Sequence, residues 1–220
     1  MIHLKPNVDQ LDIGKHLSPL QICIQYAIVV IWCLCIGIGF VNVNRWSTTP
    51  GSKGDIQEKW PTESKIVRVD GQAQIVFFVH PKCPCSLASA TELRRIAISN
   101  PSANIVVVFI CPLGTDSTFA QGDIVAAYSQ IPGVQCATDI GGIEAKIFGA
   151  KTSGHMFLYG ESGVLQFEGG ITISRGHEGE NDATLAVSSL LAGKFSPIKD
   201  WPVLGCAVES KNESDKESVK

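Results

Sequence analysis

The sequence predicts an α/β domain that follows a single transmembrane helix, and three observations lead to this prediction. An uncharged apolar stretch near the N-terminus is long enough to cross a bilayer. Further along the chain, buried strand-like runs alternate with segments of helical periodicity. The 220 residues leave room for one core beyond the apolar stretch. We therefore expect one globular α/β domain tethered to a membrane.

The charge and cysteine content exclude two classes of protein. The formal net charge is −3, and no run of Lys and Arg is longer than the pair at 94–95. Such a chain lacks the basic surface that nucleic-acid binding requires, so we expect no nucleic-acid partner. Eight cysteines are too few at this length for a small disulfide-stapled scaffold, so their positions matter more than their number.

The apolar stretch predicts a membrane anchor. Residues 17–44 contain no charged side chain, and the predicted transmembrane helix covers 20–43 after an N-terminal tail of residues 1–19. A cleaved signal peptide is the alternative, but the tail is long and no small-x-small cleavage site follows Phe40. A short tail before a long domain predicts a single-pass protein of the inner (cytoplasmic) membrane. Its domain is expected outside the cytoplasm, where disulfides persist.

The rest of the chain is predicted to alternate between strands and helices. Residues 44–65 are rich in Ser, Thr, Pro, Gly and charge, which predicts a linker. The domain is predicted at 66–195, and 196–220 are predicted to form a C-terminal tail that is disordered from Glu209 onward. The predicted strands are 75–80, 104–111, 133–139 and a hairpin within 155–170. The predicted helices are 86–99, 117–131, 140–150 and 181–193, the last capped by Asn181 or Asp182.

The order of these elements and several stretches resemble a family of redox proteins. A Cys-Pro-Cys motif at 83–85 follows the first buried strand, and residues 136–171 read CATDIGGIEAKIFGAKTSGHMFLYGESGVLQFEGGI. Both resemble the thioredoxin fold, in particular the membrane-tethered thioredoxin-like and redoxin proteins of bacterial cell envelopes, over 66–193. The stretch GGITISRGHEGEN at 169–181 resembles the RedB-like subgroup. The resemblance implies a mixed sheet flanked by helices and thiol:disulfide exchange with protein thiols and disulfides.

Cys83 and Cys85 are the predicted redox centre. Cys85 stands directly before a predicted helix, whose N-terminal N–H groups and dipole stabilise an anion, so we expect a lowered pKa for this thiol. Lys82 or His80 is expected to lower the thiol pKa further. The predicted catalytic residues are therefore Cys83, Cys85, Lys82 and His80, with the identity of the attacking cysteine left open.

The spacing of the pair departs from the Cys-x-x-Cys of thioredoxins. A disulfide across one residue closes a strained ring that is easy to reduce, so the centre is expected to be oxidising or isomerising. A disulfide from either cysteine to Cys111, at the end of the second strand, is an alternative. Otherwise Cys111 and Cys136 are predicted to pack as small apolar residues. Cys206 is a free thiol, a staple for the tail or a resolving cysteine.

Copper binding is the alternative function. Ser153-Gly154 stands where thioredoxins carry a cis-proline, and His155 follows directly. This order resembles the Sco-type copper chaperones, which use two cysteines and a distal histidine in respiratory oxidase assembly. Two thiolates and an imidazole suit copper, so the alternative metal ligands are Cys83, Cys85 and His155. A surface histidine at a strand end is the competing interpretation of His155, and no cofactor other than copper is expected.

Three further interpretations stay open. Peroxide reduction would need a Thr-x-x-Cys signature, but His80 stands three residues before Cys83. A purely structural role for the domain is another. The polar loop at 175–180 is either a solvated connection or a surface for a partner or substrate.

Overall fold

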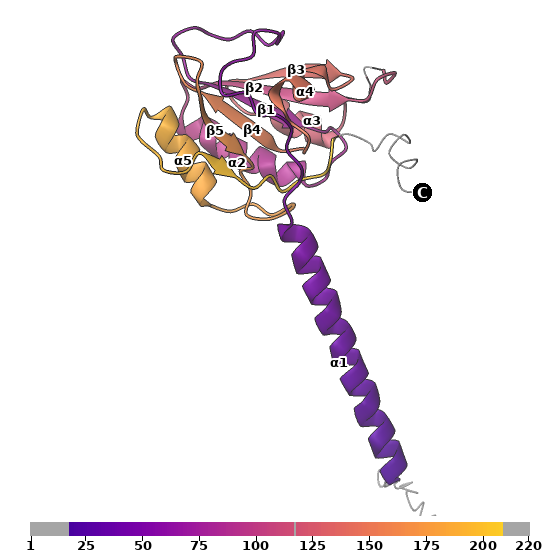
Figure 1. Cartoon of the computed structure of the whole chain (residues 1–220). Helices are drawn as coiled ribbons and strands as arrows, with labels where there is room; N and C mark the ends of the chain where they lie inside the picture. The colour runs from indigo at the N-terminus through magenta and orange to yellow at the C-terminus, as the bar shows by residue number, and fades with distance from the viewer. Residues whose placement is uncertain (1–17, 117, 209–220) are drawn as a thin grey trace, which may run out of the picture. The chain divides into compact units, whose positions relative to one another are not determined.

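A computed structural model describes residues 18–116 and 118–208. The chain divides into two units, one ending at Arg45 and the other beginning at Trp46, and each is described by itself. Helix α1, Pro19–Thr48, accounts for the described part of the first unit and has no buried residue (Figure 1). Its 30 residues rise about 45 Å, and its mean hydropathy reaches 2.3. By length and composition, α1 can cross a membrane. Residues 1–17 of the predicted tail lie outside the described residues.

The second unit is built on a six-stranded mixed sheet in the order β3-β2-β1-β4-β5-β6 (Figure 1). The strands are β1 Gln74–Val79, β2 Asn104–Cys111, β3 Val134–Ile140, β4 His155–Tyr159, β5 Leu165–Gly169 and β6 Asp200–Trp201. Strands β1, β2 and β3 are parallel neighbours, whereas β4 runs antiparallel to both β1 and β5. The predicted parallel pair and the predicted hairpin are confirmed, and the fold is thioredoxin-like.

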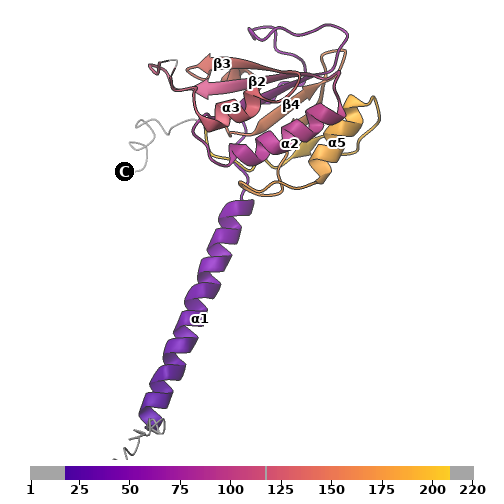
Figure 2. The same ribbon diagram turned by 180° about the vertical axis from the view of Figure 1, so that it is seen from behind.

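Two apolar cores lie on the two faces of this sheet because the strand side chains alternate. Helices α2 Ser86–Ser99, α3 Asp123–Ser129 and α5 Asp182–Leu191 cover one face, which Figure 2 shows from the front. Phe77 of β1 packs there with Leu93 of α2 and Val187 of α5. Helix α4, Ile143–Phe148, covers the other face, where Phe78 meets Phe148. The residues between β1 and α2 therefore lie where the sheet meets the start of a packed helix.

The segment predicted as a linker is ordered on the domain. The Trp60 ring lies 5.5 Å from the ring of Phe148 and 5.2 Å from that of Tyr159. Lys59 also forms a bridge with Val164 beyond the hairpin turn. The predicted linker at 44–65 is thus wrong for its second half, because Trp60 supplies apolar area to the core within a polar segment.

The C-terminal boundary of the domain also departs from the prediction. Residues 196–208, predicted as tail, contain β6, which pairs in parallel with β5. Val203 is fully buried, and its carbonyl accepts a hydrogen bond from the Gly51 N–H at 2.8 Å. The domain therefore extends past residue 195. The predicted disorder from Glu209 concerns residues outside the described chain.

Three smaller predictions have mixed outcomes. Asn181 and Asp182 were the two predicted caps of α5, and the structure shows Asn181 as the cap, in a capping box with Thr184. The helix predicted within 117–131 is shorter, because α3 begins only after Gly122 at φ 114°. Cys111 is buried as predicted, whereas Cys136 is exposed because β3 is an edge strand.

Candidate functional site

The Cys-Pro-Cys motif forms a tight turn between β1 and α2. The Cys83 N–H donates to the His80 carbonyl at 3.0 Å, and the Cys83 carbonyl accepts from the Ser86 N–H at 3.0 Å. Cys85 precedes α2 with φ −62° and ψ −21°, already helical values. Both cysteines therefore lie where β1 meets the first turn of α2.

A third cysteine completes the site. The sulfur atoms of Cys83, Cys85 and Cys206 lie within 4.8 Å of one another, and all three thiols are free. Cys83 is buried, with 2% of its surface exposed, whereas Cys85 and Cys206 are half-buried. The sequence offered Cys111 as an alternative partner and ranked no role for Cys206. The structure brings Cys206 to the pair, and this group does not include Cys111.

Backbone contacts hold Cys206 opposite the motif. The Cys206 carbonyl accepts a hydrogen bond from the Ser153 N–H at 2.8 Å, and Thr152 forms an antiparallel bridge with Ala207. A Cβ atom on Gly205 would overlap the carbonyl oxygen of Ser153. Only glycine therefore allows the segment before Cys206 to come this close.

The polar loop 175–180 contributes to the same site. The Arg175 guanidinium donates hydrogen bonds to the carbonyls of Gly205, Trp46 and Thr49. A Cβ on Gly176 would lie 3.9 Å from the Cys85 sulfur. The loop thus borders Cys85, and Arg175 holds the backbone next to Cys206. From the sequence, this loop was either a solvated connection or a surface for a partner or substrate.

Two buried serines link the cluster to the sheet. The hydroxyls of Ser86 and Ser153 lie 2.9 Å apart, and the Ser153 hydroxyl accepts from the His80 N–H at 2.8 Å. The Tyr128 hydroxyl donates to the Ser86 carbonyl at 2.8 Å. This network fixes the first turn of α2 beneath the thiols. The sequence placed Ser153 only where thioredoxins carry a cis-proline.

The network distributes charge unequally among the thiols. Burial raises the pKa of Cys83, but hydrogen bonds from the side chains of Cys206 and Ser86 and from the N–H groups of Cys206 and Cys85 outweigh it, and the pKa falls. The pKa of Cys85 is raised by burial and by the negative charge on Cys83. Burial and the neighbouring Cys83 and Cys85 raise the pKa of Cys206 to about 12. Cys83 is therefore the thiol of the three that loses its proton most readily.

Three predictions about these thiols are corrected. The lowered pKa belongs to Cys83, not to Cys85, because the donors converge on the Cys83 sulfur. The Lys82 ammonium instead donates to the Gln121 carbonyl at 3.3 Å. The His80 ring packs 5.7 Å from the Phe119 ring, and burial and then Lys82 lower its own pKa. Neither Lys82 nor His80 is among the groups that lower the Cys83 pKa.

His155 lies apart from the cysteine cluster. It is fully buried at the start of β4, where its Nε2 lies 2.8 Å from a carboxylate oxygen of Glu168. Lys53 donates to the other Glu168 oxygen at 2.7 Å. Burial lowers the pKa of His155, although the Glu168 carboxylate opposes this shift. The alternative metal ligands are therefore corrected, since Cys206 stands beside the pair and His155 does not.

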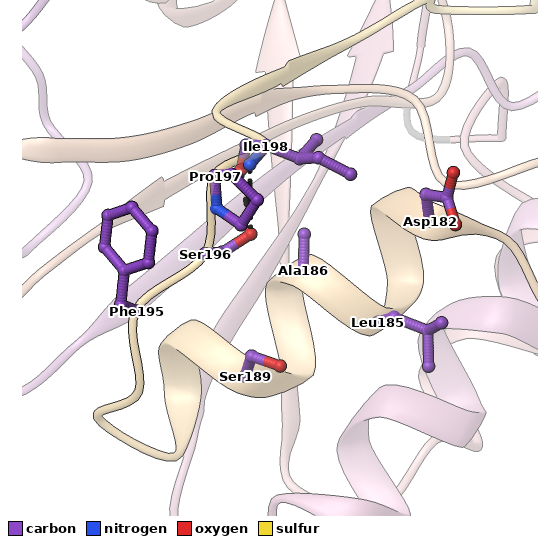
Figure 3. A pocket seen from close by; sticks show the side chains of 8 residues that line it. All are labelled: Asp182, Leu185, Ala186, Ser189, Phe195, Ser196, Pro197 and Ile198. Atoms are coloured by element: carbon purple, nitrogen blue, oxygen red, sulfur yellow. Dashed lines mark hydrogen bonds between the residues drawn. The ribbon is translucent and has the colours of Figure 1, made fainter.

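Two hollows on the domain lie away from the three-cysteine cluster. One, of about 200 Å³, lies between α5 and the segment 195–198, and Figure 3 shows Phe195 and Leu185 at its rim. The other, of about 470 Å³, lies over β3 and includes Cys136. Neither contains a member of the three-cysteine cluster.

Comparison with known proteins adds to the assignment of the fold. No family model matches the chain, and no curated protein matches it. A hypothetical protein from Sinorhizobium meliloti superposes with a TM-score of 0.54 at 21% identity, covering 76% of this chain and 97% of that one. An uncharacterized conserved protein from Geobacillus kaustophilus gives 0.53 at 18% identity, covering 75% and 95%. A secreted disulfide oxidoreductase from Mycobacterium tuberculosis gives 0.43 at 17% identity, covering 56% and 83%. At these identities the similarity concerns the fold alone.

Proposed function

We propose that this protein is a membrane-anchored thiol:disulfide oxidoreductase that oxidises protein thiols. One observation carries the proposal: three free thiols lie within 4.8 Å of one another, and hydrogen bonds lower the pKa of one of them, Cys83. Thiolates are the reactive form in disulfide exchange. A disulfide that releases a stabilised thiolate when it is reduced is a strong oxidant.

The burial of the cluster assigns different roles to its sulfurs. Cys83 is only 2% exposed, so an incoming substrate thiolate reaches a half-buried sulfur, Cys85 or Cys206, more easily. Attack there breaks the disulfide and releases Cys83 as the leaving group. A leaving thiol with a low pKa departs faster. Cys83 thus acts as the leaving thiolate.

The membrane location forms part of the same proposal. Helix α1 serves as a single-pass anchor in the inner membrane, and the domain faces the extracytoplasmic side, where disulfides persist. The proposed RedB-like subgroup rests on the sequence resemblance of residues 169–181. Arg175 of this segment donates a hydrogen bond to the Gly205 carbonyl, next to Cys206. The partners are protein thiols and disulfides.

Replacing Cys83 with serine tests this function. The full chain in detergent micelles, with glutathione disulfide as the terminal oxidant, is expected to oxidise a peptide that carries two thiols. Cys83→Ser is expected to reduce the rate to that of glutathione disulfide alone, because no intramolecular disulfide can release the stabilised thiolate. Cys136→Ser, at an exposed cysteine on β3, serves as the matched control and should retain the wild-type rate. Equal rates for wild type and Cys83→Ser would refute the proposal.

Binding of Cu(I) is the second candidate, and the three clustered sulfurs favour it. Soft thiolate ligands select Cu(I), and Cys83, Cys85 and Cys206 supply three of them within 4.8 Å. Titration of the reduced full chain against a chelating probe is expected to give one bound Cu(I) per chain. This binding should be lost in Cys206→Ser and retained in His155→Gln. Binding that depends on His155 but not on Cys206 would contradict this ligand set.

A further inference from the structure

We infer that the disulfide formed during exchange joins Cys83 to Cys206, so that Cys206 is a catalytic partner contributed by the C-terminal segment. This inference rests on the proposed thiol:disulfide exchange and names the bond that performs it. Three features carry it: the one-residue ring that a bond within the Cys-Pro-Cys motif would close, the anchoring of Cys206, and the proximity of the Cys206 and Cys83 sulfurs.

A disulfide within the motif would close a ring across one residue. The backbone of this turn is already fixed, because the Cys83 carbonyl accepts from the Ser86 N–H and the Pro84 carbonyl accepts from the Leu87 N–H at 3.4 Å. The sulfurs of Cys83 and Cys85 are within 4.8 Å of each other, but so short a ring departs from the dihedral angle that a disulfide prefers, and such strain makes the bond easier to reduce. The ring strain therefore favours a disulfide partner outside the motif.

Cys206 meets no such obstacle. It comes from a segment far away in sequence, so no short ring closes when it pairs with Cys83. Its backbone is fixed on both sides, because its carbonyl accepts from the Ser153 N–H and the Val208 N–H donates to Lys151 at 2.9 Å. Its sulfur lies within 4.8 Å of the Cys83 sulfur. The fold thus orders the Cys206 segment against the motif before any bond forms.

The exchange balances with these two sulfurs. A substrate thiolate attacks the Cys206 sulfur of the Cys83–Cys206 disulfide, and Cys83 leaves as a thiolate. A second substrate thiolate attacks the substrate sulfur of the mixed disulfide, and Cys206 leaves and takes up a proton. The substrate loses two electrons and two protons, the protein gains two electrons and one proton, and one proton goes to solvent. A disulfide-bearing partner, here glutathione disulfide, restores the oxidised protein.

Peptide mapping of the oxidised full chain tests the inference. Trypsin releases residues 83–94 and 200–211 as separate peptides. The first contains Cys83 and Cys85, and the second contains Cys206 as its one cysteine. The oxidised protein, with its free thiols blocked before digestion, is expected to yield the two peptides as one disulfide-linked species. This species should persist in Cys85→Ser and disappear in Cys206→Ser, while Cys136→Ser leaves it unchanged.

The possible outcomes separate this inference from the proposed function. Oxidation of the peptide dithiol with the disulfide confined to residues 83–94 would overturn the Cys206 assignment and leave the function standing. A linked species that is lost in Cys85→Ser would also overturn it, because the bond would then join Cys85 to Cys206. Failure of the wild type to oxidise the dithiol at all would instead reject the proposed function.

Discussion

Replacing Gly205 with alanine is expected to separate Cys206 from the other two cysteines. The added Cβ would overlap the Ser153 carbonyl, which belongs to the backbone and cannot swing away. Overpacking at such a contact costs about 1–3 kcal/mol of stability. The hydrogen bond from the Ser153 N–H to the Cys206 carbonyl would be lost in the process. We therefore expect a lower midpoint of urea unfolding and a marked decrease in the yield of linked peptides 83–94 and 200–211.

A second glycine provides the matched control. Neither Gly205 nor Gly160 has a positive φ, so alanine causes no backbone strain at either position. A Cβ on Gly160 would meet the far end of the Gln166 side chain, which can move aside. Gly160→Ala is thus expected to keep both the unfolding midpoint and the yield of linked peptides. If Gly205→Ala matched this control in both measurements, the close approach of residue 205 to Ser153 would not position Cys206.

The sheet and its helices were predictable because their signals are local. The run IVFFV of β1 is buried on both faces, and this is visible as uninterrupted apolar sequence. The cap at Asn181 is likewise set within one turn of α5. The position of Cys206 is different, because it depends on a bridge to Thr152 that no local pattern reveals. The apolar WPVLG directly before Cys206, within a polar tail, was the available signal that this segment packs.

The distribution of charge in the cluster was predicted wrongly for a related reason. The helix N-terminus was expected to stabilise Cys85, the residue beside it. In the fold, hydrogen bonds from the Cys85 N–H and the Ser86 hydroxyl instead lower the pKa of Cys83, and Cys206 adds two more through its thiol and its N–H. Two of these four donors are local, but their direction follows from the turn, and the other two come from a remote segment. The sequence therefore predicted the position of the motif but not which of its thiols has the lowered pKa.

The Ser86 hydroxyl provides a way to change the Cys83 pKa without removing a sulfur. Ser86→Ala removes one of the hydrogen bonds that lower this pKa, so the pKa is expected to rise. The thiolate absorbance of the reduced protein should then appear at higher pH than in the wild type. Ser89→Ala, at another buried serine of α2, is the matched control and should leave the titration unchanged. Persistence of the wild-type absorbance step in Cys83→Ser would assign that step to another thiol.

The same substitution is expected to make the disulfide a weaker oxidant, in a way that depends on pH. At acid pH the Cys83 thiol is protonated in both proteins, so their reduction potentials should coincide. As the pH rises through the lower, wild-type pKa, only the wild type gains the stabilised thiolate, and the Ser86→Ala potential should fall below it. Each unit of pKa difference corresponds to about 1.4 kcal/mol, or about 30 mV for a two-electron couple. Glutathione redox titrations at several pH values measure this divergence, and equal potentials at every pH would show that the thiolate of Cys83 does not set the oxidising strength of the cluster.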